Sequence, residues 1–213
     1  MNTTELLDYF RSQVVDEKKP YLWTDDEIFR FMDEAQNTFC RLTEGIADAV
    51  TPEVVTVSIV AGEIFAETHP SILLFRSAIL TSTDYPLDIK NHTDILKWTN
   101  QIGTISQMII GLQKDMVRWN YMPRDDDEVQ LIVYRLPLEP LKGPELEIEV
   151  EAVHHVSFVH WMKHLAYAKQ DADTWDPKAS ETGKAMFEAY CRQVKAEQER
   201  YKHKPRSIAY GGL

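Results

Sequence analysis

The sequence predicts an α+β fold: helices from the N- and C-terminal parts of the chain form a helical bundle, and an antiparallel β region is inserted between them. Two observations support this fold class. Near both ends of the 213-residue chain, apolar residues recur every three or four positions, as on one face of a helix. In the middle they alternate with polar residues or form short runs bounded by Gly and Pro, as in strands. Helices grouped at both ends of contiguous strands favour α+β over a parallel βαβ arrangement.

Two helices are predicted before the β region, over about residues 4–14 and 24–43. The second has a clear N-terminal signal, because the Thr24 hydroxyl can accept from the Glu27 amide while the Glu27 side chain reaches back. Both helices are expected to place one apolar face in a core. The apolar stripe of the second helix consists of Ile28, Phe31, Met32, Ala35, Phe39 and Leu42.

The β region is predicted over about residues 54–148. At its start Val55, Val57 and Ile59 alternate with other residues, which is typical of a strand. Prolines after residue 136 remove amide donors and are expected to end the strand pairing. The other elements predicted here are strands at 72–75, 78–80, 116–122 and 129–136, a short helix at 94–101, and a charged, solvated turn at 124–128.

Two more helices are predicted after the β region, over about residues 152–169 and 177–203. The first is apolar nearly all round, so we expect it to be covered on more than one side, within the domain or at a subunit contact. Asp176, followed by a proline, suits the N-cap of the second. Residues 1–203 are therefore predicted to form a single domain, and residues 204–213 are too few to fold alone.

The charge of the chain is unevenly distributed. The net charge is -11, but residues 192–213 contain six Lys and Arg against two Glu, so this end has +4 and residues 1–191 have -15. An acidic body argues against sequence-specific nucleic-acid binding, because basic patches supply the phosphate contacts. The basic end fits either a docking strip for an acidic partner or a solvated helix end.

Composition also bears on the compartment. No apolar run approaches the roughly 18 residues that span a bilayer, and the start lacks a basic stretch followed by an apolar one. We therefore expect a protein that is made in a cytoplasm and has no membrane partner. The two cysteines, Cys40 and Cys191, lie far apart in helical patterns and are expected to be buried free thiols.

Histidines crowd the predicted helix over residues 152–169, where His160 and His164 could share a face one turn apart. A metal site would need a third ligand, and no glutamate follows the first histidine as in the zincin motif. Histidines that bond to the backbone or to a partner subunit are the preferred interpretation.

No other pattern points to catalysis. Asp171, Asp173 and Asp176 lack the glycine and the distant glutamate of an EF-hand loop. The sequence also has no Gly-rich phosphate loop and no nucleophile elbow. We expect no enzymatic activity, no cofactor and no metal.

Several passages of the sequence resemble the head-to-tail adaptor (connector) proteins of tailed bacteriophages. The most specific one runs through residues 153–177, where histidines, a long apolar helix, an Ala-Tyr pair, an acidic turn and a second helix follow one another. The layout is similar over nearly the whole chain, although residues 149–151 stand where such proteins often have proline. Shorter similar passages lie at residues 61–63, 69–71, 73–78, 131–137 and 202–206.

The resemblance implies a structural protein of the virion neck: a dodecameric ring that joins the portal protein to a tail or nozzle protein and surrounds the DNA exit channel. The helical bundle would face the portal and the β region the tail. DNA would pass through the lumen without sequence-specific binding, because an acidic wall repels the duplex. The apolar helix would supply subunit contacts through Phe158, Trp161 and Leu165.

The same resemblance implies that residues 204–213 form an extended C-terminal arm that grips the portal. Such a segment would obtain its order from a partner, because alone it cannot offset its own conformational entropy. The expected contacts of this arm are Lys204, Arg206, Ile208 and Tyr210.

Three alternatives remain open. One is a tail-completion or terminator ring at the other end of the tail. Another is a small metal-dependent enzyme that uses His160 and His164 and would bind zinc. The third is a cytoplasmic helical adaptor unrelated to phages, which would be a monomer or dimer and form no ring.

Overall fold

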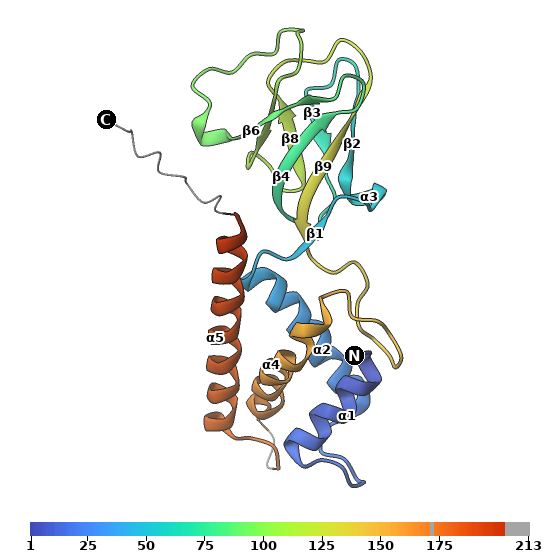
Figure 1. The fold of residues 1–213 in the computed structure, drawn as a ribbon, viewed down its shortest axis with the longest axis vertical. Coiled ribbons are helices and arrows are strands. Elements are labelled where there is room, and N and C mark those ends of the chain that lie inside the picture. Colours follow the sequence, from blue (N-terminus) through green and yellow to red (C-terminus); the bar gives the residue numbers. More distant parts are fainter. Residues whose placement is uncertain (171–172, 203–213) are drawn as a thin grey trace, which may run out of the picture. The chain divides into compact units, whose positions relative to one another are not determined.

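The structure, a computed structural model, describes residues 1–170 and 173–202 (Figure 1). The chain divides into two compact units. The helical unit comprises Met1–Thr43 and the described residues from Glu139 onward, and the β unit comprises Glu44–Leu138. Helices from both ends of the chain, with sheets between them in sequence, confirm the predicted α+β class.

The helices of the helical unit begin close to their predicted positions, and side-chain caps fix the starts of the three that follow Asn2, Thr24 and Asp176. In the second helix the Glu27 amide donates to Thr24 Oγ1 at 3.3 Å, and Glu27 Oε2 accepts from the Thr24 amide at 3.0 Å, which confirms the predicted capping box. Asp176 accepts at the start of the last helix, as predicted. The elements are α1 (Thr3–Val14), α2 (Asp25–Leu42), the 3₁₀ helix η2 (Ala152–His154), α4 (His155–Ala168) and α5 (Pro177–Lys202).

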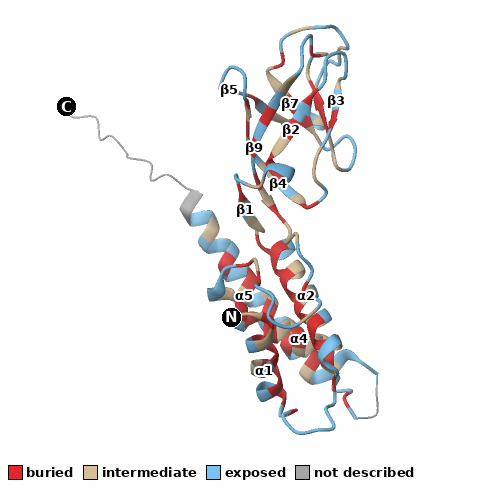
Figure 2. Ribbon diagram, turned by 90° about the vertical axis from the view of Figure 1, so that its right-hand side faces the viewer, coloured by how far each residue is buried: buried red, intermediate tan, exposed pale blue. Residues whose placement is uncertain are grey.

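Helix α4 contacts α1, α2 and α5, and buries much of its surface against them (Figures 1 and 2). Gly183 of α5 allows a close approach: a Cβ at this position would lie 2.6 Å from the carbonyl oxygen of His160 in α4. The apolar helix is thus covered within its own unit, one of the two expected arrangements. Large side chains buried at this packing include Phe10, Ile28, Met32, Phe39, Phe158, Met162 and Phe187.

Arg11 anchors the connection between α1 and α2. Its guanidinium is buried and donates to Asp16 and to Asp25, both at 2.6 Å, and to the Trp23 carbonyl at 3.0 Å. The same group lies 3.7 Å from the centre of the Tyr21 ring. A cation buried this deeply is stable only because two carboxylates and a carbonyl accept its hydrogen bonds. The need to satisfy this one side chain therefore fixes the conformation of the loop.

The β unit consists of short strands in two sheets, with the small helix α3 (Pro52–Val55) and the 3₁₀ helix η1 (His92–Asp94). One sheet has the order β1-β9-β4-β5, with β2 also pairing with β9, and the other has the order β3-β8-β7-β6. The strands are β1 (Ile46–Asp48), β2 (Thr56–Ile59), β3 (Phe65–Glu67), β4 (Ile72–Leu80), β5 (Tyr85–Pro86), β6 (Asp88–Asn91), β7 (Gln107–Ile110), β8 (Met116–Trp119) and β9 (Asp127–Arg135).

Alternating apolar residues of these strands form the core of the β unit. The side chains of β9 show the pattern most clearly, because Val129, Leu131 and Val133 are all fully buried while the residues between them are not. Trp119 and Met108 from the second sheet belong to the same core and are also fully buried. Burial of one face from each sheet is the arrangement expected of a sandwich-like pair.

The β region departs from the prediction in four ways. Val55 ends α3 instead of beginning a strand. The strands predicted at 72–75 and 78–80 are one strand, β4, whose pairing with β9 is irregular at two points, and such irregularities interrupt an alternating pattern. The β region is not wholly antiparallel, because β6 and β7 pair in parallel. Residues 139–148, predicted within the β region, belong to the helical unit.

The helix predicted at residues 94–101 was wrong. Only the turn η1 is helical, and the following segment is held by Arg118 of β8. The Arg118 guanidinium donates to the Thr99 carbonyl at 2.7 Å and lies 4.7 Å from the Trp98 ring centre. The Arg118 side chain therefore donates to the Thr99 carbonyl, which in a helix would accept from a backbone amide.

A buried ion pair joins β1 to β9. Arg135 Nε donates to Asp48 Oδ2 at 2.5 Å, and Asp48 Oδ1 accepts from the Val50 and Thr51 amides at 2.9 and 3.0 Å. Burial alone would raise the pKa of Asp48, but the hydrogen bonds from Arg135 and from these amides outweigh it and lower the pKa well below its ordinary value. The carboxylate thus stays charged and fixes the turn after β1.

Replacing Asp48 with Ala should destabilise the β unit. The substitution removes the charge that faces buried Arg135, so we expect the free energy of unfolding to fall by about 3 kcal/mol, measured by urea denaturation. Asp125→Ala, at an exposed position, is the matched control and should change it by less than about 0.5 kcal/mol. Equal effects of the two substitutions would contradict the anchoring role of Asp48.

Candidate interaction surfaces

The residues predicted to form subunit contacts lie on α4. Phe158 is fully buried within its own unit, with its ring 5.6 Å from that of Phe39. Trp161 is partly buried and packs on Phe187 at 5.3 Å between ring centres, and Leu165 is also partly buried. Their role between subunits stays a prediction, and Phe158 could act there only by supporting residues nearer the surface.

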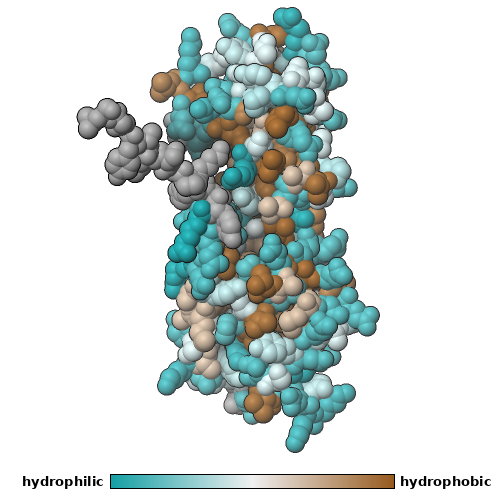
Figure 3. Space-filling view, in the orientation of Figure 1, coloured by the Kyte–Doolittle hydropathy of each residue, from teal (hydrophilic) through white to brown (hydrophobic). Residues whose placement is uncertain are grey.

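Apolar side chains that are exposed lie at the beginning of the same helical segment. Val153 of η2 is 70% exposed and Val156 of α4 is 48% exposed. Met186 of α5 is also exposed. Figure 3 shows such apolar residues scattered over the surface among hydrophilic ones. Sequence reasoning missed Val153 and Val156 because an all-round apolar helix gives no sign of which side remains uncovered.

Three of the four histidines of this segment bond to neighbouring groups, and two of them, His155 and His164, reach backbone carbonyls, in line with the preferred interpretation of the sequence. His154 and His164 bond to residues well apart along α5, and His155 bonds to the backbone before η2, so these three rings do not converge on one point. His154 Nδ1 lies 2.9 Å from Tyr190 Oη, His155 Nε2 lies 2.6 Å from the Val150 carbonyl oxygen, and His164 Nδ1 lies 2.9 Å from Ser180 Oγ.

Burial lowers the pKa of three histidines, His154, His155 and His160, below the ordinary value of 6.5. For His160 the nearby charge of Lys163 acts in the same direction. These imidazoles are therefore neutral at neutral pH. Within residues 1–170 and 173–202, no three His, Cys, Asp or Glu side chains are placed to hold a metal ion.

Both cysteines are buried free thiols, as predicted. Burial, with some help from Glu188, raises the pKa of Cys191 to about 12. A thiol that is both buried and protonated is a poor nucleophile. Neither cysteine offers a reactive surface group.

The charged turn predicted at residues 124–128 is more than a solvated loop. Asp126 accepts from the Ala61 amide at 2.7 Å, and Asp127 accepts from the Ser82 hydroxyl at 2.6 Å. The first of these bonds fixes the segment between β2 and β3, which borders the groove described next.

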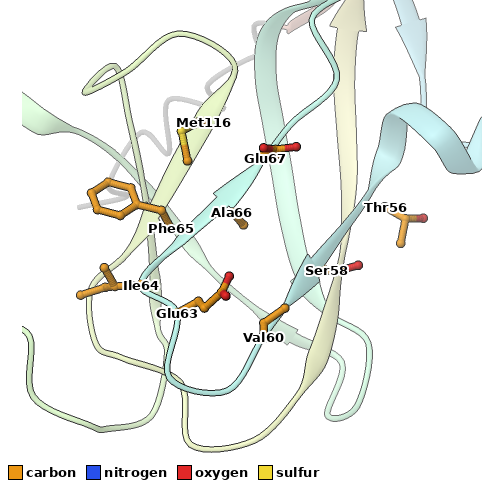
Figure 4. Close-up of a pocket in the computed structure, with 9 residues that line it drawn as sticks. All are labelled: Thr56, Ser58, Val60, Glu63, Ile64, Phe65, Ala66, Glu67 and Met116. Carbon is orange, nitrogen blue, oxygen red and sulfur yellow. The ribbon is translucent and has the colours of Figure 1, made fainter.

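A groove of about 650 Å³ lies between β2 and β3 (Figure 4). The two strands follow one another in the chain and run in opposite directions, yet they belong to different sheets, since β2 pairs with β9 and β3 with β8. Each is an outer strand of its sheet within the described structure. The groove is lined chiefly by Thr56, Ser58 and Val60 on one side and by Glu63, Phe65 and Glu67 on the other.

The register of β3 directs backbone groups into this groove. Beyond the end of β3, the Thr68 amide donates to the Asp115 carbonyl at 2.9 Å, on the side of β8. In an antiparallel strand, the backbone groups of successive residues point to opposite edges of the strand. The backbone groups of the even-numbered residues of β3 therefore point to β8. The amide and carbonyl groups of Phe65 and Glu67 therefore lie on the groove side.

The register of β2 has the same consequence. Just after β4, the Thr81 amide donates to the Glu128 carbonyl at 2.9 Å. The backbone groups of the even-numbered residues of β9 therefore point to β4, and those of the odd-numbered residues point to β2. Val57 lies opposite Val129 and is thus bonded to β9. The backbone groups of Ser58 point to the groove, which consequently has strand edges on both walls.

Charge distinguishes this groove from an ordinary pair of edges. Glu63 and Glu67 are exposed and line it, and no Lys, Arg or His is among its described lining residues. Sequence reasoning missed the groove because it depends on which distant strands pair with β2 and β3. The alternation of polar residues along β2 was visible in the sequence, but its edge position was not.

The predicted arm residues Lys204, Arg206, Ile208 and Tyr210 lie outside the described residues. The same is true of Asp171 in the acidic turn. Among the described residues, no helix combines the length and the apolar character that crossing a bilayer requires.

Comparison with known proteins gives one family. The family profile described as SU10 adaptor protein matches residues 1–208. No curated protein matches the chain. The family match covers both units and agrees with the resemblance found in the sequence.

The buried histidines predict a loss of stability in weak acid. Their folded-state pKa values are lowered, so as the pH falls below about 6.5 the unfolded chain takes up protons first. The free energy of unfolding should be fully retained at pH 7.5 and fall towards pH 5, by up to about 1.4 kcal/mol per pH unit for each histidine. Urea denaturation at several pH values measures this.

A His155→Gln variant should show a smaller loss between pH 7.5 and pH 5, because Gln does not titrate and its amide nitrogen can take the place of His155 Nε2 as donor to the Val150 carbonyl. Asp125→Asn serves as the control and should leave the slope unchanged. An identical slope in His155→Gln and in the unmodified chain would contradict the assignment to His155.

Proposed function

This chain belongs to the SU10 adaptor protein family, and on that premise we propose that it forms a ring connecting the portal of a phage to its tail. The family match over residues 1–208 is the observation that supports this role most strongly. A phage adaptor is a structural protein, so the proposed role is assembly in the virion neck, without catalysis. In this proposal the ring contains twelve copies, and it binds the portal protein on one side and a tail or nozzle protein on the other.

The division into units fits an adaptor that meets different neighbours. In the proposed arrangement the helical unit faces the portal and the β unit the tail, while residues 1–203 function together as one adaptor domain. DNA passes through the centre, where an acidic wall would repel phosphates. A lumen lined with Lys and Arg would contradict this part.

Subunit contact in the ring is proposed to involve α4. A ring pairs one surface of a subunit with a different surface of the next, so exposed apolar side chains are needed on at least one of them. Val153 and Val156 supply exposed apolar surface there, with Trp161 and Leu165 partly buried and Phe158 buried on the same helix.

The ring is expected to form when the cognate portal protein is added. Light scattering after size exclusion should show a small particle for the chain alone and a ring-sized complex with portal. A double Val153→Glu, Val156→Glu variant should weaken ring formation about tenfold or more, because charge would enter the apolar contact. Leu96→Glu, at a fully exposed site, is the control.

A small zinc-containing particle that does not bind the portal would favour the metal-enzyme alternative.

The C-terminal arm is proposed to bind the portal through Lys204, Arg206, Ile208 and Tyr210. Deleting residues 204–213 should therefore reduce capture of the chain by immobilised portal about tenfold or more. Capture by tail-tube protein instead of portal would favour the terminator-ring alternative. Unchanged capture by portal after the deletion would show that the segment is only a tail.

A further inference from the structure

Val15, the residue that follows α1, combines two features that do not help the fold. Its backbone lies in the left-handed region, with φ 59° and ψ 35°, and its side chain is 87% exposed. A β-branched residue rarely adopts this conformation, because its Cβ comes too close to the following carbonyl oxygen. Valine therefore costs stability at this position, and its side chain gains almost no burial in return.

The fold requires the left-handed conformation here, but it does not require valine. The amides of Val15 and Asp16 both donate to the Arg11 carbonyl, the second at 3.0 Å, and this turn brings the Asp16 carboxylate back to the Arg11 guanidinium. Glycine, the usual residue at such a helix end, would allow the same turn without the strain. A contact outside the chain is therefore needed to explain the side chain of Val15.

Other exposed apolar side chains lie at the same end of the helical unit. Leu22, in the connection between α1 and α2, is 47% exposed, and Trp175, just before α5, is 60% exposed. Figure 1 shows the α1–α2 connection and the start of α5 at one end of the bundle. Tyr167 of α4 lies between them, because its ring is 5.7 Å from that of Trp23 and its carbonyl accepts from the Asp176 amide at 3.2 Å. Two separate connections thus expose apolar side chains at this end.

The exposed charges of the α1–α2 connection define the partner that fits it. Asp16 is buried and paired with Arg11, which leaves one exposed carboxylate, Glu17, against two exposed lysines, Lys18 and Lys19. A lysine also lays an apolar stem along a contact while its ammonium group stays at the rim. The complementary surface is therefore apolar at its centre and carries carboxylates beside it.

We propose that Val15, Leu22 and Trp175 form a docking surface for the portal protein, with Lys18 and Lys19 facing carboxylates of that partner. This inference rests on the proposed function, in which the helical unit faces the portal. The exposed tryptophan supplies the large side chain that commonly anchors such contacts. Contact with the portal would bury the valine side chain, and this burial offsets the strain that the free chain carries.

A Val15→Gly variant of the full chain tests the strain, which needs no partner. Its Tm in scanning calorimetry should rise by about 2–4 °C, because glycine adopts the left-handed conformation freely. Val50→Gly is the matched control, since Val50 is 84% exposed but has no positive φ. Its Tm should fall, because glycine there only adds freedom to the unfolded chain. A fall in Tm for both variants would overturn the inference at its premise.

The same substitution should act in the opposite sense on binding. Capture of Val15→Gly by immobilised cognate portal should be about threefold to tenfold weaker than that of the unmodified chain, although the variant is the more stable protein. Trp175→Ala should weaken capture about tenfold or more, because it removes the largest exposed side chain of the surface. Val50→Gly should be captured as well as the unmodified chain.

Charge reversal supplies the last readout. Lys18→Glu with Lys19→Glu should weaken capture about threefold to tenfold, whereas Lys97→Glu, at an exposed position of the β unit, should leave it unchanged. Equal capture of the unmodified chain and of the Val15, Trp175 and lysine variants would overturn this inference and leave the proposed function standing. An unmodified chain that the portal does not capture would overturn both, so the two failures can be distinguished.

Discussion

The helical unit depends on one constraint: α4 has almost no polar side and must be covered. Three other helices supply the cover, and the approach of α5 requires the missing Cβ of Gly183, which faces the backbone of His160. The end of α1 and the start of α2 are then held together by Arg11, which donates to Asp16 in their connection and to Asp25 at the start of α2. Apolar cover places the helices, and one buried cation sets the path between them.

The β unit is organised by a different principle, because its strands are short and local pairing alone would not hold them. A single long strand, β9, pairs with β1, β2 and β4, so segments far apart in sequence share one partner. The ion pair of Asp48 and Arg135 locks the first of these pairings. In the second sheet Arg118 acts similarly on a loop, through the Thr99 carbonyl and the Trp98 ring. At both places a buried arginine thus holds a segment that has no regular secondary structure of its own, the turn after β1 and the loop at Trp98 and Thr99.

Sequence reasoning succeeded where the determinants were local. The capping box at Thr24 and Glu27, the helical stripes and the short apolar runs of the strands are each set by residues close together in the chain, and the fold class follows from their order. It failed at residues 94–101, where a distant arginine decides the conformation, and at β4, where irregular pairing broke the pattern. The groove was beyond reach for the same reason, since an outer strand is defined by pairings that no local pattern specifies.

The acidic edges of the groove also affect how the protein can be handled. Open strand edges invite indiscriminate pairing between copies, and native proteins commonly guard them with charge. Glu63 and Glu67 give this groove a negative charge in every copy of the chain, so the grooves of two copies repel one another while a basic segment is not repelled. This protection is electrostatic and is screened by salt. At high ionic strength the repulsion between copies at this groove is therefore weakened, and the outer edges of β2 and β3 become more open to pairing between copies.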